Sequence, residues 1–545
     1  MFNSGPFWTA YLNRFEQSRR AVLYLFFLVF VVRFILLLIS DDSAGDAIAR
    51  IYIAKNMIGH QLWITDGGWF PLHFYLIAGV LLLYDDPLFA PRLISFLCGT
   101  AIVFPFYYLV KNVFNARNAL TSIIFLTFYN LHVYFSLVSY AESLTLFLII
   151  STLYYFFKYI YSTDYRLQTL MAASVMLMMA CMVRAEPWPL IGLLSLILCW
   201  YGFRRNPIKT VISAGLFVSL PLIYIILWCF NNYMAFGDPF YSFTWGTKIG
   251  DARLIPPFYA SWEAAQQVIQ SGLKWITILF WTLGPMLALF ILIGLGRSVL
   301  ERRHIPYLVI PVSLWALTFT QTIMGNLTIQ PRYGIYSAVL LIPFGAFALI
   351  DITGKVRKTL QPYIGIGCIL LTLGITAGGY YIGRSMPPTD SVFFAGLWNV
   401  RFRSIIPDDM KQLGAWLKSH YRSNEKVLVD IGPYAGNITM AAGLDDLTHV
   451  NGTTIDYWPN LDRLYRASPV LSYKPDEFLS IDAARDHLKS YIETYKPRYV
   501  LYYTRSAFSR IFQFPGVCAT HTWHGFPFQC RYERGGYHIY EILYE

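Results

Sequence analysis

Long apolar segments joined by short loops constrain the fold of this chain more than any other feature of its sequence. A helix that crosses the hydrocarbon layer of a membrane needs about 20 predominantly apolar residues, and about eleven segments come close to this length. The segments lie near residues 21–39, 88–110, 118–135, 143–160, 168–185, 187–203, 210–230, 273–296, 306–324, 333–350 and 361–381. Composition agrees, because 14% of the 545 residues are charged, whereas a soluble domain carries about 25%. The sequence therefore predicts a mainly α-helical polytopic membrane protein.

Basic residues between the apolar segments predict the orientation of the chain. They form six clusters, at Arg14, Arg19 and Arg20; Lys111 and Arg117; Lys158 and Arg166; Arg204, Arg205 and Lys209; Arg297, Arg302 and Arg303; and Lys355, Arg357 and Lys358. With eleven spans all six fall on one side, and Lys and Arg are enriched in cytoplasmic loops. We therefore expect a cytoplasmic N-terminus at residues 1–20, a transmembrane domain at 21–381 and a soluble extracytoplasmic domain at 382–545.

One apolar stretch, residues 71–84, decides the count, because a full span there would reverse the side of every later loop. It has only about 14 residues, which is typical of an interfacial or re-entrant segment. We therefore expect it to lie in the outer membrane surface. Two outer loops are then long, at residues 40–87 and 231–272.

The net charge of +11 does not indicate nucleic-acid binding, because the basic residues sit in loops where they orient the spans, and we expect no nucleic-acid partner. Five of the seven cysteines lie in apolar segments, where they pack as small hydrophobic residues. The other two, Cys518 and Cys530, lie in the polar C-terminal region. An oxidising compartment there would favour a disulfide between them.

The C-terminal region changes in composition and alternates between helical and extended patterns. The periodicity predicts helices near residues 408–421 and 481–495 and strands at 426–431, 499–503 and 537–544. We expect a small α/β domain on the outer side of the membrane.

The first long outer loop carries three candidate acids. From Asp46 onward, apolar residues recur at helical spacing, which predicts an amphipathic helix on the outer membrane surface with Asp46 at its N-terminal cap. A carboxylate at this position could also act as a general base on an acceptor hydroxyl or amine. Asp41 and Asp42 are alternatives, although both could simply solvate the end of the first span.

Charged residues in three other outer loops are further candidates. Glu142 begins an apolar run, where it is either a helix-start acid or a functional carboxylate. Arg184 could bind a phosphate, or it could pair with Glu186 or anchor the interface. Arg332, next to Tyr333, would lie at the level of the lipid headgroups, where it either binds a phosphodiester or snorkels to the interface.

Five sequence motifs follow one another along the chain: GDAIARIYIAKNMIGHQLW, WFPLHFYLIAGVLLL, APRLISFLCGTAIVFPFYYLVKNVF, YAESLTLFL and PRYGIYSAVLLIP. As an ordered set, they resemble the GT-C superfamily of polytopic glycosyltransferases that use polyprenyl-phosphate sugars. The branches that they resemble are the protein O-mannosyltransferase-like and the lipid A aminoarabinose transferase-like enzymes. The motifs cover roughly residues 20–350. The resemblance implies a GT-C bundle of about eleven helices with a C-terminal extracytoplasmic domain.

The resemblance also implies a reaction. Asp46 would deprotonate the acceptor, which attacks the anomeric carbon from the face opposite the departing lipid phosphate, so that the configuration inverts. Family members often have Asp followed by Glu in this loop, whereas Asp46 is followed by Ala47, so the neighbouring Asp41-Asp42 pair stays a competing assignment for the base. The candidate catalytic residues are Asp46, Glu142 and Asp42; the candidate donor phosphate-binding residues are Arg184, Arg332, Tyr333 and Arg92; and the candidate residues of the acceptor or sugar pocket are Trp69, His73 and Glu186.

We expect no cofactor and no metal, because many members of this branch need none and no Cys/His cluster has metal-site spacing. The expected partners are a polyprenyl-phosphate sugar in the bilayer and an extracytoplasmic acceptor. The expected location is a plasma or inner membrane, or the endoplasmic reticulum in a eukaryote.

Two other functions compete with this interpretation. A transporter or flippase would show internal repeats, broken spans in corresponding halves and ionisable residues at mid-membrane. The chain has no convincing repeat, and apart from Arg33 its charges lie at span ends. An assembly subunit that keeps the fold without catalysis is a third possibility.

Overall fold

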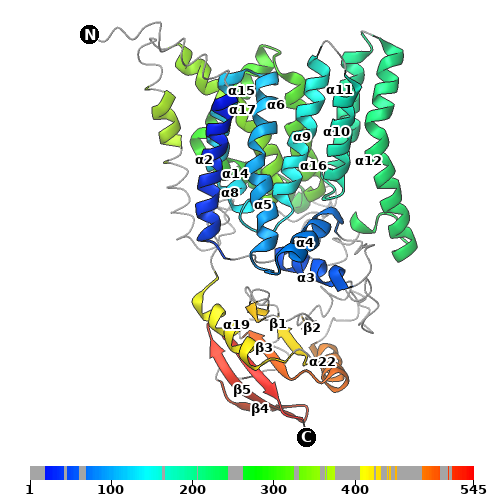
Figure 1. Cartoon of the computed structure of the whole chain (residues 1–545), viewed down its shortest axis with the longest axis vertical. Coiled ribbons are helices and arrows are strands. Elements are labelled where there is room, and N and C mark those ends of the chain that lie inside the picture. The colour runs from blue at the N-terminus through cyan, green and yellow to red at the C-terminus, as the bar shows by residue number, and fades with distance from the viewer. Residues whose placement is uncertain are drawn as a thin grey trace.

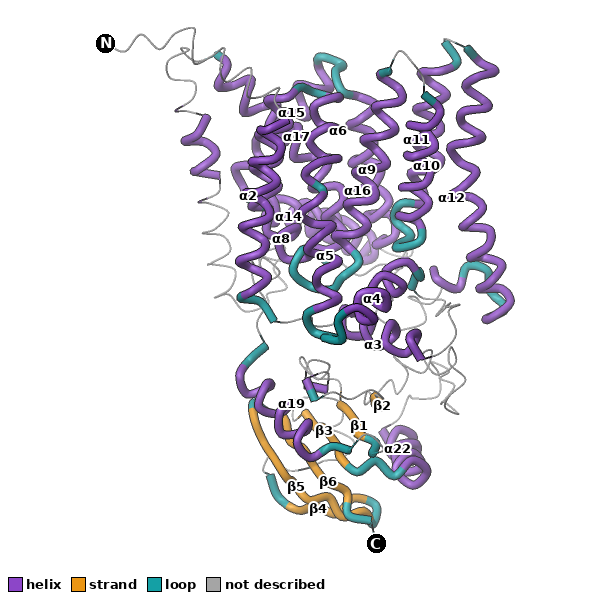
Figure 2. Tube along the Cα trace, viewed as in Figure 1, coloured by secondary structure: helices purple, strands orange, loops and turns teal. Residues whose placement is uncertain are grey.

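A helical bundle and a smaller sheet-containing domain make up the computed structural model (Figure 1). The described residues are 19–41, 46–59, 69–162, 166–204, 206–243, 262–323, 330–355, 363, 365–372, 374, 406–422, 425–430, 438–439, 441–442, 448–450, 481–503, 514 and 518–544. The C-terminal domain lies beyond the end of the bundle where α3 and α4 are found (Figures 1 and 2). The prediction of a mainly helical membrane protein with a C-terminal α/β domain is confirmed.

The bundle is built from helices of unequal length. Its elements are α2 (Arg19–Leu38), α3 (Asp46–Gly59), α4 (Leu72–Leu83), α5 (Ala90–Ala101), α6 (Val103–Val113), α7 (Ala116–Phe128), α8 (Asn130–Phe135), α9 (Glu142–Tyr161), α10 (Leu167–Cys181), α11 (Trp188–Gly202), α12 (Pro207–Phe236), α14 (Trp262–Leu283), α15 (Pro285–Leu300), α16 (Ile305–Ile323), η2 (Pro331–Gly334) and α17 (Ile335–Gly354). Among the described residues, six helices are long and apolar enough to cross a membrane, and four shorter apolar helices accompany them. The chain is thus a multi-pass membrane protein.

The predicted spans coincide with these helices in position, but the span at 118–135 is divided between α7 and α8 at Tyr129, and those at 168–185 and 187–203 form two of the shorter apolar helices. The segment at residues 273–296 is not one straight span, because α14 and α15 meet at an angle of 112°. Gly284 adopts a φ of 86° at the break, and Pro285 begins α15, where its missing N–H costs no helical hydrogen bond. The Gly284-Pro285 pair is a local sign of this break that the apolar length of the run did not take into account. The predicted span at 361–381 falls mostly outside the described residues.

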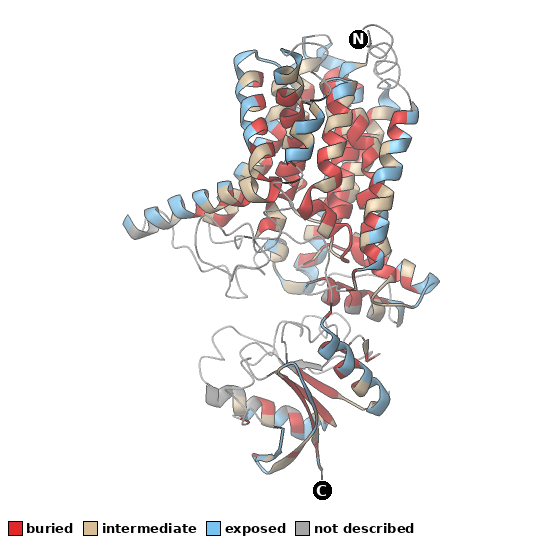
Figure 3. Cartoon of the chain, turned by 90° about the vertical axis from the view of Figure 1, so that its left-hand side faces the viewer, coloured by how far each residue is buried: buried red, intermediate tan, exposed pale blue. Residues whose placement is uncertain are grey.

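Small residues let the helices of the bundle approach closely. A Cβ atom on Gly294 of α15 would lie 2.0 Å from the carbonyl oxygen of Phe344 in α17. A Cβ on Gly345 would lie 2.8 Å from the side chain of Leu287 in α15. Such contacts stabilise membrane helices through van der Waals packing, since lipid removes the hydrophobic driving force between them. Buried residues accordingly fill the interior of the bundle, while helices at its edge expose apolar side chains (Figure 3).

A fully buried arginine joins the first span to the break between α7 and α8. The Nη2 atom of Arg33 lies 2.7 Å from Nδ1 of His132, and its Nε donates to the hydroxyl of Ser136 at 3.3 Å. A charged side chain within a span is costly unless it faces the protein interior and finds partners. Arg33 therefore fixes α2 against α8.

The predicted amphipathic helix forms as α3 and begins at Asp46. Its apolar face does not rest on lipid, because Ile48, Ile51 and Ala54 pack against Ile77 and other apolar residues of α4 and α5. Helix α4 has 12 residues, and it is one of the shorter apolar helices rather than a full span. Together α3 and α4 make a layer at the end of the bundle that faces the C-terminal domain (Figure 1).

In its described residues, the C-terminal domain contains a six-stranded mixed sheet with two helices. Its elements are α19 (Asp408–His420), β1 (Val427–Asp430), β2 (Thr448–Val450), α22 (Ile481–Tyr495), β3 (Tyr499–Tyr503), β4 (Thr520–Trp523), β5 (Phe526–Arg534) and β6 (Tyr537–Ile542). The strand order is β2-β1-β3-β6-β5-β4, in which β1 pairs in parallel with β2 and β3, and the remaining pairs are antiparallel. All five elements predicted in this region form, while β2, β4 and β5 were not predicted.

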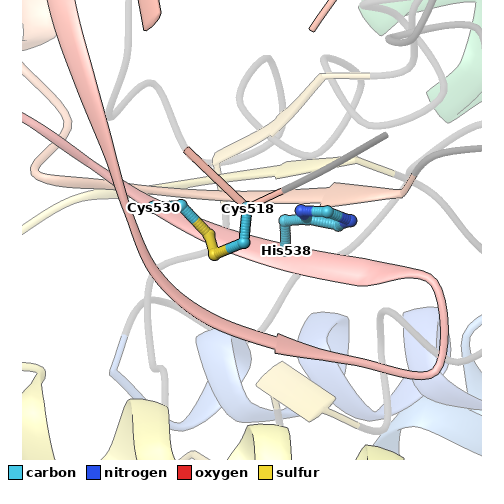
Figure 4. Close-up of side chains that lie close together, drawn as sticks. All are labelled: Cys518, Cys530 and His538. Atoms are coloured by element: carbon cyan, nitrogen blue, oxygen red, sulfur yellow. A yellow bond between two sulfur atoms is a disulfide. The ribbon is translucent and has the colours of Figure 1, made fainter. Parts of the chain in front are cut away.

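A disulfide joins Cys518 to Cys530, as expected, and it pins the segment before β4 onto β5 (Figure 4). His538 of β6 lies beside it, and the ligand atoms of these three residues are within 4.8 Å of one another. They form the one group among the described residues with ligand atoms near enough to hold a metal ion. The bonded cysteines have no thiolate to offer, so this group does not fit a metal in its oxidised form.

Asp41, at the end of the first span, connects the two parts of the protein. Its carboxylate accepts a hydrogen bond from the backbone N–H of Ile406 at 2.7 Å and pairs with Lys411 of α19 at 2.5 Å. The sequence offered Asp41 as an alternative catalytic acid or as a solvated end of the span. Its carboxylate instead attaches the C-terminal domain.

Candidate active site

Four segments that are far apart in the sequence meet at the end of the bundle near α3 and α4. They are the start of α4, the start of α9, the turn between α10 and α11, and η2 with the first turn of α17. The backbone N–H of Leu72 donates to the carbonyl of Met182 at 3.0 Å and joins α4 to the α10–α11 turn. The polar side chains of these segments form a group that we call the outer cluster: His73, Glu142, Arg184, Glu186, Arg332 and Tyr333.

Arg184 occupies the centre of the outer cluster. Its Nη1 donates to Glu142 at 3.1 Å, its Nη2 donates to Glu186 at 2.6 Å, and its Nε reaches both carboxylate oxygens of Glu186 at 2.9 and 3.1 Å. Burial alone would raise the pKa of Glu186, but the charge and hydrogen bonds of Arg184 outweigh it and lower that pKa. The ion pair between Arg184 and Glu186, which the sequence offered as the alternative to phosphate binding, is therefore present.

Two tyrosine rings hold the second arginine beside the first. The guanidinium carbon of Arg332 lies 4.9 Å from the ring centroid of Tyr333 and 6.0 Å from that of Tyr140. Its Nη2 also donates to the hydroxyl of Tyr333 at 3.0 Å. The guanidinium carbon of Arg184 lies 5.6 Å from the same Tyr333 ring. Cation–π contacts with one ring thus bring two positive charges to one place at the edge of the bundle.

His73 enters the outer cluster from α4 and is fully buried. Burial and the positive charges of Arg50 and Arg184 hold the pKa of His73 well below its usual range, so the ring is neutral at pH 7. A neutral imidazole can donate one hydrogen bond and accept another. His73 is therefore suited to a polar, uncharged group such as a sugar hydroxyl.

Three buried polar atoms on two residues of the outer cluster, His73 and Glu142, have no hydrogen-bond partner among the described residues. They are both ring nitrogens of His73 and Oε2 of Glu142, whose side chain is 1% exposed. Each buried polar atom without a partner costs about 1–3 kcal/mol. Three such atoms at one place therefore destabilise the fold, and a bound polar ligand that forms hydrogen bonds to them would remove this free-energy cost.

The candidate bases of the first outer loop differ in what the structure describes. Asp46 is the first residue of α3, and its backbone places it at the start of the layer that α3 forms with α4. Its side chain and the whole of Asp42 lie outside the described part of the chain.

Trp69 lies next to the outer cluster but contacts α3. The guanidinium carbon of Arg50 is 4.7 Å from the Trp69 ring and 5.4 Å from the Phe74 ring. Arg50 is buried, because these two rings cover it. The positive charges of both Arg50 and Arg184 thus act on His73.

Arg92 has a structural setting unlike that of the two arginines of the outer cluster. Its Nε donates to the carbonyl of Leu137 at 2.7 Å, and its Nη2 donates to the carbonyl of Leu37 at 3.1 Å. These bonds tie the first turn of α5 to the end of α2 and to the loop before α9. The structure therefore brings Arg184, Arg332 and Tyr333 together and places Arg92 in a backbone clamp.

Sequence reasoning missed Tyr140 and Arg50, and also Tyr336 of α17, which interacts electrostatically with Arg184, Glu142 and Glu186. Tyr140 precedes Glu142 by two residues, and Arg50 follows Asp46 by one helical turn. Their closeness in sequence to candidate site residues was therefore a signal that could have identified both. Nothing in the pattern around Tyr336 sets it apart from other apolar positions.

Comparison with known proteins bears on the segments that form this site. A family model described as dolichyl-phosphate-mannose-protein mannosyltransferase matches residues 69–228, which include His73, Glu142, Arg184 and Glu186. No curated protein sequence matches the chain.

Solved structures share the fold over almost the whole chain. The crystal structure of ArnT from Cupriavidus metallidurans bound to undecaprenyl phosphate has a TM-score of 0.61 at 11% identity and covers 96% of this chain and 98% of its own. An oligosaccharyltransferase from Archaeoglobus fulgidus, tethered to an acceptor peptide, has a TM-score of 0.54 at 12% identity, with 90% of this chain and 70% of its own covered. The chain therefore shares the fold of these two structures, and its residues 69–228 match the dolichyl-phosphate-mannose-protein mannosyltransferase model.

Proposed function

We propose that this protein is an inverting glycosyltransferase that moves a sugar from a polyprenyl-phosphate donor to an acceptor on the outer side of the membrane. The observation that carries the proposal is the outer cluster, where buried charges and three buried polar atoms without partners lie next to the helix that begins at Asp46. The similar folds add support, since ArnT was solved with undecaprenyl phosphate and an archaeal oligosaccharyltransferase with dolichol phosphate and an inhibitory peptide.

In the proposed reaction, Asp46 takes the proton of the acceptor hydroxyl or amine. The freed lone pair forms a bond to the anomeric carbon, and the bond from that carbon to the phosphate oxygen breaks, leaving its electron pair on polyprenyl phosphate. Attack from the face opposite the leaving group inverts the anomeric configuration. Asp42 is the alternative base in this scheme.

Arg332 and Arg184 would stabilise the phosphate as its negative charge grows. Their two positive charges flank the Tyr333 ring, and fixed charges that face a developing charge are among the strongest contributions to catalysis. Glu142 and Glu186 hold the guanidinium of Arg184 from two sides, which orients it before the donor arrives.

His73, Glu186 and Trp69 would line the sugar or acceptor pocket. His73 contributes a neutral ring that can donate and accept, and Glu142 contributes its second carboxylate oxygen. The proposed chemistry needs no metal and no cofactor, because polyprenyl phosphate is a good leaving group. We place the reaction at a plasma or inner membrane, with the N-terminus in the cytoplasm and the outer cluster on the opposite side.

The test is to replace Asp46 with Asn and to measure sugar transfer from a radiolabelled polyprenyl-phosphate sugar in membranes. Loss of a general base lowers a rate by about a hundredfold to ten-thousandfold. Asp85→Asn is the matched control, because Asp85 is an exposed acid of the same loop. Wild-type transfer by the Asp46→Asn protein would exclude Asp46 as the base and direct the same experiment to Asp42.

A further inference from the structure

A separate pocket, with both polar and apolar lining residues, lies at the opposite end of the bundle from the outer cluster. It has a volume of about 210 Å³ and opens between α9, α11 and α12. Helix α9 links the two places, since Glu142 begins it and Tyr159 lies roughly 25 Å further along its axis. The pocket therefore plays no part in the chemistry proposed for the outer cluster.

The walls of this pocket are held by specific contacts. The hydroxyls of Tyr159 and Ser213 are hydrogen bonded at 3.0 Å, which joins α9 to α12. Asn206 caps α12 by accepting the backbone N–H of Lys209 at 2.9 Å. Gly202 allows α11 to meet α12, because a Cβ there would lie 2.3 Å from the hydroxyl of Thr210.

The residues around the pocket favour an anion. Lys209, Asn206 and the hydroxyl-bearing residues Tyr159, Tyr201, Thr210 and Ser213 line it, and no acidic residue is among the lining residues that the structure describes. Arg204 follows the lining residue Gly202 by two positions, and its guanidinium carbon lies 4.9 Å from the centroid of the Trp200 ring. The Lys209 ammonium and the Asn206 side-chain amide are donors that suit a phosphate, whereas the Thr210 hydroxyl donates to the Asn206 carbonyl and the Tyr159 and Ser213 hydroxyls bond each other.

The size of the pocket and its surroundings select a lipid over a free metabolite. Pockets for drug-sized ligands hold about 300–1,000 Å³, so 210 Å³ admits a single headgroup. Apolar side chains at the ends of α11 and α12 are highly exposed beside it, including Ile208 at 75%, Leu196 at 69% and Trp200 at 64%. These surfaces can contact acyl chains while the headgroup occupies the pocket.

We propose that this pocket binds the phosphodiester headgroup of an anionic phospholipid from the adjacent leaflet. The orientation predicted from the basic loops makes that leaflet the cytoplasmic one, in which basic pockets between spans bind anionic headgroups. The bound lipid would bridge α9 to α11 and α12. It would do so at the end of the bundle where the hydrogen bond between Tyr159 and Ser213 already joins α9 to α12.

Native mass spectrometry of the purified full-length protein tests this proposal. The protein is incubated with phosphatidylglycerol or with phosphatidylcholine of the same acyl chains, and the retained adducts are compared. The wild-type protein should retain more phosphatidylglycerol. The Lys209→Gln variant should lose about fivefold in phosphatidylglycerol affinity, since one basic residue at a membrane surface contributes about 1 kcal/mol.

Lys355→Gln is the matched control. Lys355 is a 71% exposed lysine after α17, at the same end of the bundle but away from the pocket, and its replacement should leave the adducts unchanged. A second variant, Ser213→Leu, fills the pocket and should lower phosphatidylglycerol binding further.

Two results would overturn the proposal: equal retention of the two lipids by the wild-type protein, or equal phosphatidylglycerol binding by the Lys209→Gln and Lys355→Gln variants. Polyprenyl phosphate serves as the third lipid. Its adducts should be unchanged in the Lys209→Gln variant, so a selective loss of polyprenyl phosphate binding in this variant would also refute the assignment. The function proposed for the outer cluster is tested separately, by the sugar-transfer measurement.

Discussion

Replacing Arg184 with Met tests whether the ion pairs of the outer cluster hold the bundle together at that end. Arg184 makes four hydrogen bonds to two carboxylates, and the Glu142 side chain is 1% exposed, against 19% for Glu186. Without Arg184, Glu142 becomes a buried charge without its ion-pair partner, which costs about 3–5 kcal/mol. Glu186 loses less, because it is more exposed and Arg332 also stabilises its charge.

The Arg184→Met variant should therefore unfold with a free energy about 3–5 kcal/mol below that of the wild-type protein. Denaturant titration in mixed micelles measures this value, with labelling of the buried thiol of Cys181 as the probe. The double variant Arg184→Met, Glu142→Gln removes the unpaired charge and should recover most of the loss. A single variant within about 1 kcal/mol of the wild-type protein would refute the reasoning, and so would a double variant as unstable as the single one.

Three further predictions concern the C-terminal domain. Asp41→Ala should speed hydrogen exchange at the start of α19, with little effect on the bundle, because it removes the contacts that attach this helix; unchanged exchange there would contradict it. Cys518→Ser should lower the unfolding free energy of the domain by about 2–4 kcal/mol, measured by denaturant titration. Burial would raise the pKa of Glu541, but hydrogen bonds from Arg498 and Arg531 outweigh it and lower that pKa. The stability that this carboxylate contributes is present above its unfolded pKa of about 4.3 and is lost as pH falls through the folded value, so Glu541→Gln should flatten the acid limb of a stability–pH curve.

The helices that sequence reasoning found were those with a clear period. Segments α3 and α22 begin at the residues that the apolar spacing indicated, and β3 matches the predicted strand. The hairpin of β4 and β5 was missed although a local signal existed. His524 and Gly525, with φ of 49° and 88°, make a two-residue turn in which both residues have positive φ, and Pro527 just after the turn weakened the strand pattern.

For the candidate site, the sequence predicted which charges gather but not how they pair. Loop charges predicted that Glu142, Arg184 and Arg332 would share one face, because short loops leave little choice of position. The same reasoning could not separate Arg92 from them, since its role depends on carbonyl groups at the ends of other helices. Contacts of that kind have no pattern along the chain, and only the fold brings them together.

The attachment at Asp41 limits how freely the C-terminal domain can move. Asp41 and Asp46 are five residues apart, and a chain of that length spans at most about 18 Å. The residue that anchors the C-terminal domain and the residue that begins α3 are therefore joined by one short segment of chain. Any partner that moves the C-terminal domain away from the bundle must either break the contacts of Asp41 with Ile406 and Lys411 or displace the start of α3 as well. In this arrangement, a large acceptor or a fused tag that displaces the domain would change the rate of transfer without touching the outer cluster.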